Sequence, residues 1–380
     1  MWLPITMADA LSIQAKETSV DRAPTGKRDD VHSSAKKNGG QCVELPDVHS
    51  NPSSGDTCTD SDPAELPSAP IFQLRDIGVA KRGVARREKE YQDRVSSLFD
   101  AMATRQGIRT VRVPNEDTLV TVGEHYPNFA RVIDQLTAEF AFAKHALPEF
   151  ITFTPKLLDG PPGVGKTMFA EALAKAMNVP FLKISLGSIQ GGFEITGTAM
   201  HWSNAAPGRL IEILADHAEA NPVVLLDEID KMSDYRSDRV SACLLDLLDP
   251  QQAKRLRDDG CNMVFDASKL ILIATSNNRD LIASPLLNRM EVFDIALPTI
   301  SEMEGMVSRI WLELLDRCSL DTGIHLPEST IAEIVASGTS PRQISRALRI
   351  ALGRALLNKQ SVIHSLELPL ASKHRRPGFV

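Results

Sequence analysis

The stretch from residue 157 to residue 177 decides the fold, because it reads as a short apolar strand, a glycine-rich turn and an amphipathic helix. The turn consists of Gly160, Pro161, Pro162, Gly163, Val164, Gly165, Lys166 and Thr167. It matches the complete G-x-x-x-x-G-K-[S/T] pattern, whose backbone N–H groups converge on phosphate oxygens at the start of a helix. We therefore expect Lys166 to neutralise nucleotide phosphates and the Thr167 hydroxyl to ligate Mg²⁺, which makes ATP and Mg²⁺ the predicted cofactors.

A second motif follows about sixty residues later, where the apolar residues 223–226 lead directly into Asp227 and Glu228. A wholly apolar run is typical of a central parallel strand, and ligands bind beyond the carboxyl ends of such strands. Asp227 is expected to hold the magnesium ion, and Glu228 to polarise a water for in-line attack on the γ-phosphoryl group. Alone, this pattern is often only the end of a strand. It becomes strong evidence for a nucleotide site because a phosphate loop precedes it in the chain.

Apolar runs and amphipathic stretches alternate around these motifs. Strands are predicted at residues 108–113, 157–158, 181–186, 223–226, 270–275 and 292–295. Strands that alternate with helices predict an α/β fold with a parallel sheet. Beyond Pro298 the strand signals stop, and helices are predicted to begin at Ser301, near Pro327 and at Ser340. We expect a P-loop parallel-sheet domain followed by a small all-α lid domain.

The predicted organisation has five parts. They are a disordered tail (1–75), a helical or linker segment (76–122), the α/β nucleotide-binding domain (123–300), the α-helical lid (301–360) and a carboxyl-terminal tail (361–380). The first part is rich in Ser, Asp, Pro, Gly and Lys and has no periodic apolar face, so it cannot offset its ordering entropy. The second carries a basic run from Lys81 to Lys89, which we interpret as a solvated helix face.

Composition argues against several classes of protein. The chain has 42 Lys and Arg against 49 Asp and Glu, a net charge of −7, which disfavours nucleic acid and anionic lipid as general partners. No apolar run approaches the ~20 residues of a membrane span, and the first residues do not read as a signal peptide. The five cysteines form no C-x-x-C pair. We expect a cytoplasmic protein without a disulfide framework or structural zinc.

With both nucleotide motifs in place, the chain resembles an AAA+ ATPase, and more closely the ATPase module of Lon-type ATP-dependent proteases. The segments that carry the resemblance are residues 124–126, 185–209, 227–232, 248–252, 274–277 and 285–291. The resemblance implies an ATP-hydrolysing motor that unfolds or remodels a protein substrate through the pore of a homo-hexameric ring. The chain ends about twenty residues after its last predicted helix, so we expect no Ser/Lys protease domain and leave a separate protease partner open.

The same resemblance assigns roles to individual residues. It places His125 and Tyr126 in the adenine pocket and makes Asn277 the sensor that orients the attacking water. Arg289 matches the arginine finger, which in this family reaches into the neighbouring subunit's site. The alternative for that arginine is an ion pair on the surface with Glu291 or Asp294. Trp202 occupies the aromatic pore-loop position that grips the polypeptide, although a single tryptophan is more often part of a core.

Arg342 has an argument of its own. Ser340, Pro341 and Gln343 read as the N-cap, the first helical position and the closing residue of a capping box, which puts Arg342 at the second position of a helix. A cation there opposes the helix dipole unless an anion lies nearby. The γ-phosphate would be that anion, in agreement with the family's second sensor.

One departure from the family concerns the first strand, which is only two residues long and runs into Asp159. We expect it to lower the affinity for nucleotide. Two other functions stay open: a nucleic-acid-associated motor or loader that uses the basic run, and an ATP-gated scaffold with little turnover. The presence of Glu228, Asn277 and Arg289 together favours hydrolysis.

Overall fold

The computed structural model describes residues 66–85, 89–189, 191–202, 204–232, 237–318 and 323–363. The predicted tails therefore lie outside the described residues, apart from 66–75 and 361–363. Part of the basic run, residues 86–88, lies outside them as well.

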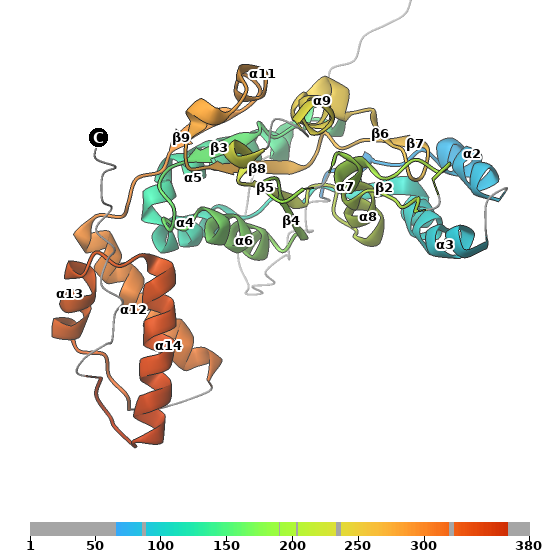
Figure 1. Ribbon diagram of the computed structural model, residues 1–380. Helices are drawn as coiled ribbons and strands as arrows, with labels where there is room; N and C mark the ends of the chain where they lie inside the picture. The colour runs from blue at the N-terminus through green and yellow to red at the C-terminus, as the bar shows by residue number, and fades with distance from the viewer. Residues whose placement is uncertain are drawn as a thin grey trace, which may run out of the picture. The chain divides into compact units, whose positions relative to one another are not determined.

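A five-stranded parallel sheet forms the centre of the α/β part (Figure 1). Its strands, in the order in which they lie side by side, are β4 (Phe181–Ser185), β5 (Val223–Asp227), β8 (Ile271–Ser276), β3 (Lys156–Asp159) and β9 (Glu291–Asp294). Every residue of β5 and β8 is buried, as expected for central parallel strands with apolar sequences. All five strands confirm the predicted α/β fold class, and their carboxyl ends meet at one edge.

The α/β part also contains α-helices. They are α4 (Glu116–His125), α5 (Ala130–His145), α6 (Lys166–Met177), α7 (Phe193–Thr196), α8 (Arg209–Asp216), α9 (Ser237–Leu248), α10 (Pro250–Ala253) and α11 (Ser284–Leu287). Helix α6 buries Phe169, Leu173 and Met177 on one face, as the apolar spacing predicts. It contacts β4, β5 and β8 and packs beside α4 (Figure 1).

Short elements precede the sheet in the chain: β1 (Ser68–Pro70), α2 (Leu74–Val84), α3 (Lys89–Ala103) and β2 (Ile108–Thr110), with β1 and β2 antiparallel. Residues 66–75, which the sequence assigned to the disordered tail, form β1 and the beginning of α2. The reason is that Ala69, Ile71 and Phe72 are buried, and the Phe72 ring lies 6.4 Å from that of Phe265. So short an apolar stretch shows no period in the sequence.

An antiparallel hairpin of β6 (Leu256–Asp258) and β7 (Met263–Phe265) was not predicted. It lies against α2 in space, although about 180 residues separate the two in sequence. The hairpin and α2 enclose a cavity of about 600 Å³.

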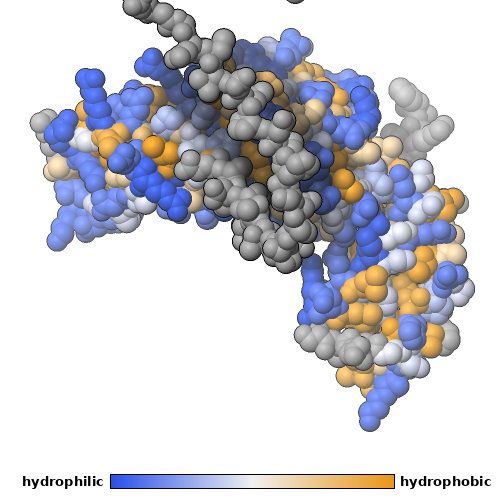
Figure 2. All heavy atoms as spheres, turned by 180° about the vertical axis from the view of Figure 1, so that it is seen from behind, coloured by the Kyte–Doolittle hydropathy of each residue, from blue (hydrophilic) through white to orange (hydrophobic). Residues whose placement is uncertain are grey.

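The carboxyl-terminal part is all-α, as predicted, and consists of α12 (Ile300–Arg317), α13 (Glu328–Ala336) and α14 (Pro341–Leu357). It has a separate core around Val307, Trp311, Ile344 and Leu348. Its surface also carries apolar residues (Figure 2), of which Leu357 is 84% exposed. Among the described helices, none has the length and apolar character needed to cross a membrane.

Candidate functional site

The phosphate loop joins β3 to α6 and takes a backbone shape that only glycine adopts easily. Gly163 and Gly165 have φ angles of +88° and +99°, in the left-handed region. A Cβ atom on Gly160 would lie 2.2 Å from the Ile295 carbonyl oxygen, so this glycine lets the loop pass directly over the end of the sheet. Gly165 is the residue that precedes α6, so the loop leads straight into the N-terminus of that helix.

Lys166 reaches back over this loop. Its Nζ donates to the carbonyl oxygens of Gly160 (2.6 Å) and Pro161 (3.1 Å) and to Oδ1 of Asn277 (3.1 Å). Burial lowers the pKa of Lys166, while the charges of nearby aspartates, Asp159 first, act in the opposite direction. The lysine of the first motif and the predicted sensor at the end of β8 are therefore in direct contact.

Asp227, at the end of β5, is held by three side chains. Thr275 donates to its Oδ1 (2.6 Å), Thr167 lies 3.4 Å from the same oxygen, and Lys183 Nζ lies 2.6 Å from Oδ2. Burial alone would raise the pKa of Asp227, but the hydrogen bonds from Lys183 and Thr275 outweigh it, and the pKa is lowered. The carboxylate is ionised at neutral pH and lies beside a hydroxyl of the phosphate loop.

Glu228 has an unusual backbone for a residue that is not glycine. Its φ and ψ angles are 59° and 49°, and its N–H donates to Thr275 Oγ1 (3.0 Å). Its Oε1 forms an ion pair with Lys231 Nζ at 2.5 Å. A left-handed conformation costs a non-glycine residue of order 1–3 kcal/mol, and such strain clusters at active sites, ligand clamps and switch regions. This strain distinguishes Glu228 from an ordinary residue at the end of a strand.

These groups line one cavity of about 530 Å³, a size typical of small-molecule sites. Its lining residues are Pro162, Gly163, Gly165, Lys166, Thr167, Met168, Lys183, Ser185, Asp227, Glu228, Thr275, Asn277 and Arg342. Nine of them were predicted from the sequence, whereas Met168, Lys183, Ser185 and Thr275 were missed. The missed residues on strands share one signal, because they stand at or near the carboxyl ends of β4 and β8.

Five of the predicted phosphate-loop and adenine-pocket residues do not line the cavity. Four of them are Val164, which is buried, Gly160 and Pro161, which contact Lys166, and His125. Tyr126, which is also outside the lining, packs edge-on against Phe129 and Phe169 behind the phosphate loop. Burial raises the pKa of Tyr126 to about 12. The adenine-pocket role of His125 and Tyr126 stays a prediction.

Arg289 is not among the residues that line its own chain's cavity. Its Nη1 donates to the Pro285 carbonyl oxygen (2.9 Å), and its Nε is buried without a hydrogen-bond partner. Asp294, one of the acids expected to pair with it on the surface, is bound by Arg279 at 2.7 Å. In the described part of the chain no salt bridge to Arg289 is found, so the alternative of a surface ion pair loses its support.

Arg342 lies at the start of a helix and Trp202 on a loop, as their neighbours in the sequence predict. Ser340 and Gln343 form the capping box of α14, which places Arg342 at the second helical position, and Arg342 lines the cavity. Trp202 is 61% exposed and lies on a loop closed by a hydrogen bond from Thr198 N to Ala206 O (2.8 Å). Trp202 is therefore not part of the core.

The donor set beside the phosphate loop fits a magnesium ion. Mg²⁺ prefers oxygen ligands, commonly one or two carboxylates together with phosphate oxygens. The Thr167 hydroxyl and the Asp227 carboxylate supply such oxygens 3.4 Å apart at the mouth of the loop. Both were predicted as the ligands.

Comparison with known proteins agrees with this geometry. The family described as "ATPase family associated with various cellular activities (AAA)" matches residues 156–296, which span the sheet from β3 to β9. This part of the chain is therefore a P-loop ATPase domain of the AAA type. More particularly, it resembles the ATPase region of Lon proteases, as the sequence motifs predict.

Two relatives illustrate the resemblance. Lon protease homolog 2, peroxisomal, of Zea mays is 40% identical over 206 residues, which cover 52% of this chain and 23% of that protein. Lon protease 1 of Bacillus subtilis is 46% identical over 140 residues, 37% of this chain and 18% of the relative. The matches thus span about a quarter or less of these relatives' length. Among solved structures, a mutant of Thermotoga maritima RuvB has a TM-score of 0.44 at 18% identity, covering 62% of this chain and 66% of that one.

Proposed function

We propose that this chain is a Mg-ATP-hydrolysing motor that remodels or unfolds protein substrates, in the manner implied by its Lon-like ATPase domain. The observation that carries the proposal is the convergence of Lys166, Asp227, Glu228 and Asn277 on one cavity. A site built only to bind nucleotide needs the lysine and the glycine-rich loop. The carboxylate of Glu228 and the amide of Asn277 are additional groups that water activation requires.

The residues divide the chemistry between them. Lys166 and the backbone of the phosphate loop bind the phosphates, while Thr167 and Asp227 would hold Mg²⁺, which neutralises phosphate charge when it is bound. Lys231 occupies one oxygen of Glu228, and the other is left to accept the proton of an attacking water. Asn277, fixed by Lys166 at 3.1 Å, orients that water.

Assembly belongs to the proposal. Arg289 lies outside its own cavity and carries an unpartnered buried Nε, which suits a guanidinium that completes a neighbouring subunit's site. Arg342 would contact the γ-phosphate from the helical part. We therefore propose a homo-hexameric ring that acts in the cytoplasm on a protein substrate. A separate protease could degrade what the ring unfolds.

The Trp202 loop is the proposed grip on that substrate. An exposed tryptophan offers a large, rigid apolar contact, and this one stands on a closed loop and touches no group of the nucleotide site. We expect Trp202→Ala to keep the ATPase rate within about twofold of the parent and to lose ATP-driven unfolding of a tagged, folded fluorescent protein.

Phe150→Ala is the matched control, because Phe150 is a comparably exposed aromatic residue (62%) on a different segment. It should leave both activities unchanged. If folded Trp202→Ala protein still unfolds the substrate at the parent rate, this loop does not grip polypeptide. If the parent hydrolyses no ATP, the whole proposal fails.

A further inference from the structure

The base of the Trp202 loop is fastened to the β6–β7 hairpin, although about fifty residues separate them in sequence. The N–H of Gly208, where the loop runs into α8, donates to Oδ2 of Asp258 at 2.8 Å. On the other side of the loop, the Thr196 carbonyl oxygen accepts from Asp259 N at 2.7 Å. The loop is thus anchored on both flanks by neighbouring residues of one turn.

Glycines make this contact possible. A Cβ atom on Gly260 would lie 2.1 Å from the Ala206 carbonyl oxygen, and one on Gly208 would lie 2.3 Å from that of Ile195. Gly197, with φ at +84°, has the N–H groups of both Gly208 and Gly260 within 3 Å of where its Cβ would be. The backbones of loop and hairpin therefore touch directly, and a shift of the hairpin turn must move the loop.

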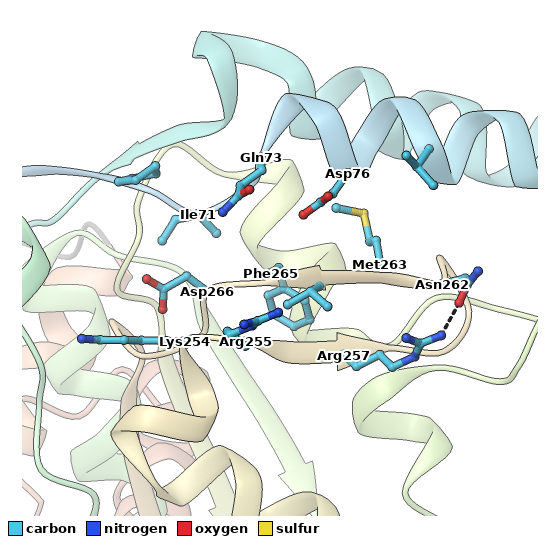
Figure 3. A pocket seen from close by; sticks show the side chains of 13 residues that line it. Ile71, Gln73, Asp76, Lys254, Arg255, Arg257, Asn262, Met263, Phe265 and Asp266 are labelled. Atoms are coloured by element: carbon cyan, nitrogen blue, oxygen red, sulfur yellow. Dashed lines mark hydrogen bonds between the residues drawn. The ribbon is translucent and has the colours of Figure 1, made fainter.

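The hairpin itself is braced. Figure 3 shows Arg257 on β6 and Asn262 in the turn joined by a hydrogen bond, with α2 above them. From the other direction, the hydroxyl of Tyr91 on α3 donates to the Gly260 carbonyl oxygen. The turn that holds the loop is consequently tied both to its own strand and to a helix outside the sheet.

The side chain of Asp258 accepts hydrogen bonds from both sides of this contact, the base of the loop and the hairpin turn. It is wholly buried (0% exposed), with Oδ1 accepting from Cys261 N at 2.6 Å in the turn and Oδ2 accepting from Gly208 N. Gly208 is the N-cap of α8 and has no side chain with which to cap it. The carboxylate thus also lies at the positive end of the α8 dipole, a favourable place for a negative charge.

We propose that Asp258 is a positioning residue for the Trp202 loop, and that its carboxylate locks the base of the loop to the hairpin. The role in substrate handling rests on the proposed function, whereas the effect on the loop does not. With the lock intact, Trp202 is held at a fixed place relative to the sheet. Without this contact, ATP can still be hydrolysed, but movements of the hairpin during the ATPase cycle no longer move the loop.

The environment of Asp258 disfavours its negative charge. Burial raises the pKa of Asp258 to about 6, although the hydrogen bonds from the Cys261 and Gly208 backbones lower it. The ionisable groups that interact with it or with its direct neighbours are Tyr91 on α3, Arg209 and Glu212 on α8, Cys243 and Asp246 on α9, and Asp259 and Cys261 in the turn. No salt bridge to Asp258 exists within the described residues. The two backbone N–H donors, one from each side of the contact, therefore compensate for part of the cost of burying this carboxyl.

Fluorescence of Trp202 tests the proposal directly. In a full-length background with Trp2→Phe and Trp311→Phe, Trp202 is the only tryptophan left of the three. At about pH 7.5 we expect the anisotropy of Trp202 to be lower, and its quenching by acrylamide to be stronger, in Asp258→Ala than in the parent, because both N–H groups lose their acceptor. Asp258→Asn, which keeps one acceptor oxygen, should give a signal between the two.

Asp259→Asn is the matched control, because it removes an adjacent carboxylate that is about half exposed and pairs with Arg257. It should keep the parent's Trp202 signal. Asp258→Ala should retain ATP hydrolysis while substrate unfolding falls at least tenfold, and Asp258→Asn, which still offers one acceptor oxygen, should recover part of it.

The outcomes separate the two proposals. A folded Asp258→Ala protein with the parent's Trp202 signal overturns the positioning role. A Trp202 signal that responds as expected in a protein that unfolds no substrate supports the lock and contradicts the threading function. Should Asp258→Ala fail to fold, a folded Asp258→Asn protein with the parent's Trp202 signal overturns the positioning role as well.

Discussion

At the scale of single residues, the site depends on Thr275 as much as on the residues that the motifs identify. Its hydroxyl donates to Asp227 Oδ1 and accepts from the backbone N–H of Glu228. One side chain on β8 therefore orients the proposed magnesium ligand and supports the strained conformation of the proposed base. Because the turn after β5 is held this way, the Glu228 side chain points to the end of β4, where Oε2 would lie 3.2 Å from a Cβ on Gly187.

The role of Glu228 gives the first prediction at this scale. Glu228→Gln should bind ATP with nearly the parent affinity but lose turnover by ~10²–10⁴-fold, the usual contribution of a general base. Glutamine keeps the size of the side chain and its contact with Lys231, yet it cannot take a proton from water. Single-turnover hydrolysis and the equilibrium binding of a fluorescent ATP analogue measure the two effects separately.

Lys231→Ala is the informative companion, because it removes the ion-pair partner and leaves the carboxylate. It should retain most of the turnover. A Glu228→Gln protein that hydrolyses ATP near the parent rate would show that another group accepts the proton.

At the scale of helices and strands, Arg109 on β2 joins the ends of two helices through their carbonyl groups. This arginine is almost wholly buried, and burial lowers its pKa. Its guanidinium donates to carbonyl oxygens of Ala101, Thr104, Ile108, Leu214 and Ala215. Four of these carbonyls lie at or near the carboxyl-terminal ends of α3 and α8, where helix carbonyls lack partners and a cation is favourable.

Removing this group should weaken the whole molecule. We expect Arg109→Ala to lower the free energy of unfolding by roughly 3–5 kcal/mol, because buried carbonyl groups at two helix ends lose their donors. Arg109→Lys keeps the charge but not the five-donor geometry and should recover only part of the loss. Urea unfolding followed by circular dichroism measures both, and a loss below about 1 kcal/mol for Arg109→Ala would mean that water replaces the guanidinium.

The elements that could be predicted are those with a local signal. The strands of the sheet are apolar runs, α6 begins at a phosphate loop, and α14 begins at a capping box that Ser340 and Gln343 form as expected. The hairpin of β6 and β7 has three-residue strands, and its position depends on distant partners such as Tyr91 and Thr196. No local pattern contains such information.

The same distinction applies to the site. Lys166, Asp227 and Glu228 belong to contiguous motifs, and the structure brings them together. Lys183 enters the site through strand pairing, because β4 lies beside β5 with Ser185 opposite Asp227. A lysine on a strand is unremarkable in sequence until the neighbouring strand and its register are known.

At the scale of the whole molecule, the position of Arg289 bears on assembly. Each chain has Lys166 in its own cavity, whereas Arg289 lies outside it. If subunits pack head to tail in a ring, each active site combines Lys166 of one subunit with Arg289 of the next. In such a ring, a subunit that lacks Lys166 is defective at one of its two interfaces, and a subunit that lacks Arg289 is defective at the other. An experiment with mixed subunits can detect this difference.

We expect Arg289→Ala and Lys166→Ala proteins to be inactive separately and to recover ATPase activity when mixed. In an equimolar random ring, about one quarter of the interfaces join an Arg289→Ala subunit, which keeps Lys166, to a Lys166→Ala subunit, which keeps Arg289. Only those interfaces have both groups, so the recovered rate should approach that fraction of the parent rate and reach its maximum at equal amounts. Mixing either variant with the doubly substituted protein is the control and should recover nothing. If co-assembly is confirmed by mass photometry and no mixing ratio restores hydrolysis, Arg289 acts within its own subunit or has no part in the reaction.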